Sequence, residues 1–73
     1  DPLNVDKQIA CADLEVANGK VEDAFARLLN CVRNLTDEEK NRAKDHLISL
    51  FGLIDQADPR LIQARKDLAS ALF

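Results

Sequence analysis

The sequence has 73 residues, which is enough for one small domain, and its formal net charge is -3. Hydrophobic residues make up 47% and charged residues 32%, a balance typical of a compact folded protein rather than a disordered segment. Charges of both signs are interleaved, so we expect no nucleic acid partner. The apolar run 47–54 is far shorter than the roughly 20 residues of a membrane span, and we expect no N-terminal signal. We therefore expect no membrane partner and a cytoplasmic location.

Glycine and proline each occur only twice, while alanine, leucine and charged residues dominate, which favours helix over strand. The sequence predicts an all-α fold of four helices. The two cysteines, Cys11 and Cys31, are too few and too far apart for a disulfide scaffold or a Cys-x-x-Cys site. We expect no metal, no cofactor and no catalytic site.

The first helix is predicted over residues 4–17, where Val5, Ile9, Ala12 and Val16 repeat at helical spacing. Its start is ambiguous, since either Asn4 or the Asp1-Pro2 pair could cap it. Its end is clear at Asn18-Gly19, because glycine readily takes the left-handed conformation that follows a helix.

The second helix is predicted over residues 20–34, with an apolar stripe in which Phe25 should be the most sensitive core position. The short connection at Gly19 forces the first two helices into an antiparallel hairpin. In that register Cys11 and Cys31 lie too far apart for a disulfide. We expect both to be mostly buried small apolar residues, with a redox-responsive thiol at one of them as the alternative.

The third helix is predicted over residues 36–54, starting at a capping box formed by Thr36 and Glu39. Its apolar stripe consists of Ala43, Leu47, Leu50, Phe51 and Ile54, and Gly52 weakens the last turn. His46, the only histidine, has no second ligand one turn away, so we expect an ordinary surface or boundary residue.

The fourth helix is predicted over residues 59–72, because Asp58 is a good cap and Pro59 suits the first helical position. It carries two apolar stripes. We assign one to the core: Leu61, Ala64, Leu68, Ala71 and Leu72. The other, Ile62, Ala69 and Phe73, either binds a partner or folds back over the core through Phe73.

The four helices form two helix-turn-helix units, about 4–34 and 36–73, with a spacing close to the 34-residue tetratricopeptide period. In the first unit, Gly19 and Ala24 match the turn and the close-packing position of that repeat. The second unit is degenerate, as a terminal repeat is expected to be. We therefore expect residues 1–73 to form one domain of tetratricopeptide type.

Three segments, 21–29, 46–51 and 58–73, closely resemble the C-terminal part of the thioredoxin-plus-tetratricopeptide co-chaperones, the YbbN or CnoX family, in its actinobacterial form. The most specific feature is the closing pattern of Arg65, Leu68, Leu72 and Phe73. The resemblance implies that the chain is the C-terminal part of a longer protein with an N-terminal thioredoxin-fold domain. It also implies a holdase that binds unfolding clients and delivers them to the chaperonin GroEL through the helix 59–73.

We accordingly expect a non-catalytic protein-interaction module. The partner-binding residues are expected on the outer side of the fourth helix: Ile62, Arg65, Lys66, Ala69 and Phe73. The first alternative is a homodimerisation module that buries the second stripe against its own copy. A less favoured alternative is a thiol-responsive domain that acts through Cys11 or Cys31.

Overall fold

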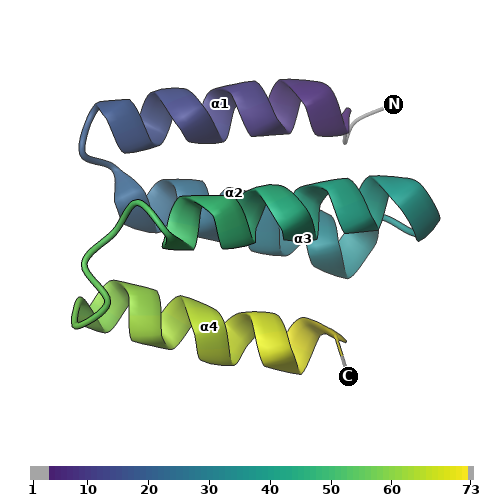
Figure 1. Cartoon of the computed structure of the whole chain (residues 1–73). Coiled ribbons are helices and arrows are strands. Elements are labelled where there is room, and N and C mark those ends of the chain that lie inside the picture. The colour runs from purple at the N-terminus through teal and green to yellow at the C-terminus, as the bar shows by residue number, and fades with distance from the viewer. Residues whose placement is uncertain (1–3, 73) are drawn as a thin grey trace.

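The structure is a computed structural model that describes residues 4–72 and contains four α-helices joined by short connections. These are α1 (Val5–Ala17), α2 (Val21–Asn34), α3 (Asp37–Phe51) and α4 (Pro59–Leu72). Figure 1 shows that consecutive helices run in opposite directions, so the chain forms two helical hairpins. The described residues are 81% helical and contain no strand, which confirms the predicted fold class.

The first hairpin begins and turns as the sequence predicts. The Asn4 side chain accepts a hydrogen bond from the backbone N–H of Lys7 at 3.2 Å, so Asn4 is the cap. The alternative cap, Asp1-Pro2, lies outside the described residues. Gly19 has a φ of 79°, and the backbone N–H of Lys20 bonds back to the carbonyl of Glu15 at 2.7 Å. This left-handed residue reverses the chain between α1 and α2.

Thr36 is the N-cap of α3, as predicted, but the side-chain hydrogen bond of the predicted capping box does not form. The Thr36 side chain accepts no hydrogen bond from the helix, and α3 begins at Asp37, whose φ is 54°. Thr36 itself is extended, as a capping residue is, so the predicted start of α3 is confirmed and only the cap hydrogen bond is missing.

α3 also ends earlier than expected, at Phe51 instead of residue 54. The side-chain amide of Gln56 donates to the carbonyl oxygens of Phe51 at 3.0 Å and Ile54 at 3.1 Å. These two bonds satisfy carbonyls near the end of the helix, so the chain can leave the helical path at Gly52.

The start of α4 follows the prediction from Asp58-Pro59. The Asp58 carboxylate accepts from the backbone N–H of Arg60 at 2.8 Å and from its guanidinium at 2.7 Å. Both hydrogen bonds lower the pKa of Asp58, and the bond from the guanidinium has the larger effect. The cap thus fixes both the first turn of α4 and the position of the Arg60 side chain.

The hydrophobic core is centred on α2, which packs against all three other helices. In Figure 1, α1 and α4 lie on opposite sides of the pair formed by α2 and α3. Phe25 is buried as expected, and its ring meets that of Phe51 edge to face, with centroids 5.2 Å apart. The buried residues are Val5, Ala12, Val21, Ala24, Phe25, Leu28, Leu29, Cys31, Val32, Ala43, Leu47, Leu50, Phe51, Leu61, Ala64 and Leu68.

Two residues predicted to be buried are exposed instead. Cys11 lies on the outer side of α1, and Leu72 at the end of α4 is 40% exposed. α1 and α4 are the outer helices, and each buries only a narrow face against the core. Residues beside that face therefore remain exposed to water. Only Cys31 of the two thiols is part of the core.

Polar contacts join α1 to its neighbours, and sequence reasoning missed them. Arg27 on α2 forms an ion pair with Glu15 at 2.7 Å and donates to Gln8 at 2.8 Å. His46 on α3 lies at the protein boundary, as expected, and its Nε2 is 2.6 Å from an Asp13 oxygen. Because the partners are 12 to 33 positions apart in the chain, no local pattern pointed to them.

None of the helices in residues 4–72 combines the length and the apolar character needed to cross a bilayer.

Candidate partner-binding surface

The predicted partner-binding residues that the structure describes are all exposed on α4. Ile62 is 43% exposed, and Arg65, Lys66 and Ala69 are also exposed. Phe73 lies outside the described residues, so its predicted role has no structural counterpart here. The outer side of α4 therefore presents both apolar and cationic side chains.

A hollow of about 500 Å³ lies between the C-terminal half of α3 and α4. We call it the partner-binding groove. Its floor is formed by the buried side chains of Phe51 and Leu68, and its edges are largely apolar. The complete lining is Ile48, Phe51, Gly52, Gln56, Arg65, Leu68, Ala69 and Leu72.

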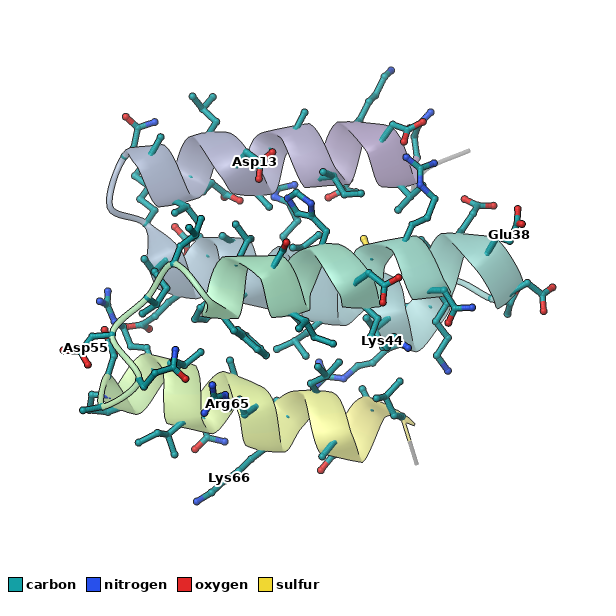
Figure 2. All side chains as sticks on the ribbon, in the orientation of Figure 1. Asp13, Glu38, Lys44, Asp55, Arg65 and Lys66 are labelled. Atoms are coloured by element: carbon teal, nitrogen blue, oxygen red, sulfur yellow. The ribbon has the colours of Figure 1, made fainter. Side chains whose placement is uncertain are left out.

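Of the predicted residues, the groove brings together Arg65 and Ala69 but not Ile62 or Lys66. In Figure 2, the Lys66 side chain points away from α3, whereas Arg65 lies on the side nearer to it. The Arg65 guanidinium donates to the side-chain oxygen of Gln56 across the mouth of the groove. Helical spacing accounts for Lys66, which lies about 100° round the helix from Arg65, whereas Ile62 precedes the groove by about one turn.

The groove also contains two apolar residues that sequence reasoning did not assign to the surface. Ile48 on α3 is 50% exposed, and Leu72, which was assigned to the core, is 40% exposed. Ile48 directly follows the fully buried Leu47 but lies about 100° from it around the helix, outside the predicted stripe. The missed signal is that the apolar face of α3 is wider than one neighbouring helix covers.

Residues 4–72 contain no cluster of His, Cys, Asp and Glu suited to hold a metal ion. Both cysteines are free thiols, and burial raises the pKa of the Cys31 thiol, with Arg27 opposing that shift. Among the residues lining the partner-binding groove, Arg65 carries the charge.

The chain is similar to three mycobacterial proteins, each 43% identical over 70 residues. These are Uncharacterized protein Mb1359 of Mycobacterium bovis and Uncharacterized proteins MT1366 and Rv1324 of two Mycobacterium tuberculosis strains. The match covers 96% of this chain but 23% of each relative, so the chain spans about a quarter of their length. No solved structure gives a significant match.

The model of the tetratricopeptide repeat, a unit that generally mediates protein–protein interaction without catalysis, matches residues 1–73. Its match over the whole length agrees with the two helical hairpins and the tight turn at Gly19. The chain therefore belongs to the tetratricopeptide repeat family.

Proposed function

We propose that this chain is the protein-binding module of a thioredoxin-linked co-chaperone and that it holds apolar segments of partner proteins in the partner-binding groove. The observation that carries the proposal is the pair Ile48 and Leu72, two large apolar side chains that stay half in water on the two walls of one groove. Exposed apolar surface that lines a groove is typical of protein interaction sites.

The energetics favour a partner that supplies apolar side chains. Covering a fully exposed leucine or isoleucine contributes about 1.5–3 kcal/mol, so two half-exposed residues can contribute about 2 kcal/mol together. The buried Phe51 and Leu68 beneath them give a packed floor that needs little rearrangement on binding. Arg65 on the rim can then exchange its bond to Gln56 for a carbonyl or carboxylate of the partner.

The identity of the partners rests on the resemblance to the YbbN or CnoX co-chaperones. On this proposal, residues 1–73 form a single domain at the C-terminal part of a cytoplasmic protein with a thioredoxin-fold domain. Its partners are the chaperonin GroEL and unfolding client proteins. The relatives, of which the match covers 23%, are long enough to contain such a further domain. The exposed residues Ile62 and Lys66 would extend the contact beyond the groove, and Phe73 is added to them on the sequence prediction alone.

The proposal is tested by measuring the binding of the chain to immobilised GroEL, and to reduced, unfolded lysozyme as a client, by biolayer interferometry. Ile48→Ser and Leu72→Ser should each weaken binding about fivefold, because each removes an apolar contact worth about 1 kcal/mol. Leu14→Ser is the matched control, since Leu14 is 65% exposed on α1, on the opposite side of the molecule. Circular dichroism should show that all three variants remain folded.

The outcomes separate the parts of the proposal. Equal binding by the Ile48→Ser and Leu14→Ser variants would show that the groove is not the binding surface. Binding of unfolded lysozyme without binding of GroEL would overturn the chaperonin as a partner. A mass that rises with concentration in analytical ultracentrifugation and falls to the monomer in Ile48→Ser would replace the proposal with homodimerisation.

A further inference from the structure

A second groove lies between α2 and α4, on the other flank of α4 from the partner-binding groove. We call it the acidic groove. Its volume is about 360 Å³, and its floor is formed by the buried residues Phe25, Leu29 and Ala64. The complete lining is Glu22, Phe25, Ala26, Leu29, Pro59, Arg60, Gln63, Ala64 and Asp67.

The acidic groove has a carboxylate at each end. The two helices run in the same direction, and Glu22 and Arg60 stand in their first turns, whereas Leu29 and Asp67 stand about two turns further along them. The pKa of Arg60 is raised mainly by Asp58 and to a smaller extent by Glu22. Glu22 is therefore close to Arg60, which fits this alignment. With a rise of 1.5 Å per residue, the walls are about 10–12 Å long, which matches two turns of a bound helix.

The charge of the groove is negative in spite of Arg60. That guanidinium bonds to Asp58 at 2.7 Å, so most of its charge is balanced outside the groove. Asp67 accepts a hydrogen bond from the neutral amide of Gln63 at 2.9 Å, which leaves its charge uncompensated. Glu22 on the facing helix is exposed. The groove therefore combines an apolar floor with two carboxylates about two helical turns apart.

We propose that the acidic groove binds a helical protein segment that carries a lysine or arginine at each end of a short apolar stretch. An apolar side chain of the segment packs over Phe25 and Leu29, while its cations, about seven residues apart, reach Glu22 and Asp67. The Asp67 end contributes more to recognition, because Arg60 offsets part of the attraction at the Glu22 end. This surface does not overlap the partner-binding groove, so the chain can hold two segments of opposite charge character at once.

The test uses a fluorescein-labelled helical peptide with lysines at positions i and i+7 and leucines at i+3 and i+4, all on one face. A matched peptide has glutamates in place of both lysines. Fluorescence anisotropy should show binding of the lysine peptide, with affinity falling as salt rises, and at least tenfold weaker binding of the glutamate peptide. Asp67→Lys should weaken binding of the lysine peptide about fivefold and Glu22→Lys by less.

Asp23→Lys is the control with the same change in net charge. Asp23 follows Glu22 in sequence but lines a separate polar furrow between α1 and α2. Its variant should bind the lysine peptide as the parent chain does. The proposal is overturned if the parent chain fails to bind the lysine peptide or if all three variants are weakened equally. It is also overturned if Ile48→Ser abolishes binding, because the peptide would then occupy the partner-binding groove.

Discussion

Cys11 and Cys31 occupy neighbouring helices but different surroundings. Cys31 is fully buried and burial raises its thiol pKa, whereas Cys11 is exposed on α1. Cys11 stands between Ala10 and Ala12 in the sequence, but only Ala12 faces the core. An alanine-rich helix gives little indication of which side faces inward, since alanine is tolerated both in the core and in water.

This difference predicts unequal reactivity of the two thiols. Under native conditions near pH 8, iodoacetamide should modify Cys11 at least roughly tenfold faster than Cys31, because a buried thiol with a raised pKa forms little thiolate. Mass spectrometry of tryptic peptides over time would give both rates, and denatured protein would serve as the control for equal access. Equal rates in the folded protein would contradict the burial of Cys31.

Glu15 makes stability depend on pH through its pairing with Arg27. The hydrogen bond from Arg27 lowers the pKa of Glu15 below its ordinary value of 4.5. Burial opposes this shift but has a smaller effect. A carboxyl whose pKa is lower in the folded state stabilises the fold above its ordinary pKa. That stability is lost as the pH falls through the folded-state pKa.

Glu15→Gln should therefore destabilise the chain at pH 7 and progressively less as the pH is lowered from 5 towards 3. Urea unfolding at several pH values would measure the difference in unfolding free energy between the variant and the parent chain. Glu38→Gln, at an exposed position in the first turn of α3, makes the same change in net charge away from Arg27 and is the control. A Glu15→Gln difference that stays constant from pH 7 to pH 3 would show that the ion pair does not contribute.

At the scale of the helices, the sequence predicts which helices form and in what order better than it predicts where each helix begins and ends. The boundaries set by Asn4, Gly19 and Asp58 are confirmed, because in each case the signal is a local backbone or capping preference. The C-terminal end of α3 differs from the prediction, because it depends on Gln56 reaching back to Phe51, and at its start the predicted side-chain bond of Thr36 is missing. Neither of these features follows from residue type and spacing.

The two glycines should respond differently to alanine. Gly19 has a φ of 79°, so Gly19→Ala should cost about 1 kcal/mol of unfolding free energy, although no atom crowds the new methyl group. Gly52 has a φ of -69°, and an added Cβ would lie 3.4 Å from the Ser49 carbonyl oxygen, an ordinary contact. Gly52→Ala should change stability by less than about 0.5 kcal/mol.

Urea unfolding of both variants at pH 7 measures this contrast, and each glycine serves as the control for the other. A loss at Gly52 as large as that at Gly19 would show that backbone conformation does not determine the difference.

At the scale of the whole molecule, the packing of four amphipathic helices around α2 follows from their apolar stripes, but the grooves do not. α4 carries more apolar residues than one face can bury, and this excess indicated a binding surface before its shape was known. The position of the groove depends on how far α3 and α4 separate over Phe51 and Leu68. Ile48 was missed for the same reason, because its exposure is set by where α4 lies and not by its own helix.

The most direct test of the proposed binding surface is hydrogen–deuterium exchange of the chain alone and bound to GroEL, read by mass spectrometry. We predict slower exchange on binding in peptides from the end of α3 and from α4, roughly residues 48–72, because a partner in the groove covers these segments and restrains their opening. Peptides from α1 should exchange as in the free chain. Protection confined to α1, or the same exchange in free and bound states throughout residues 48–72, would contradict the account.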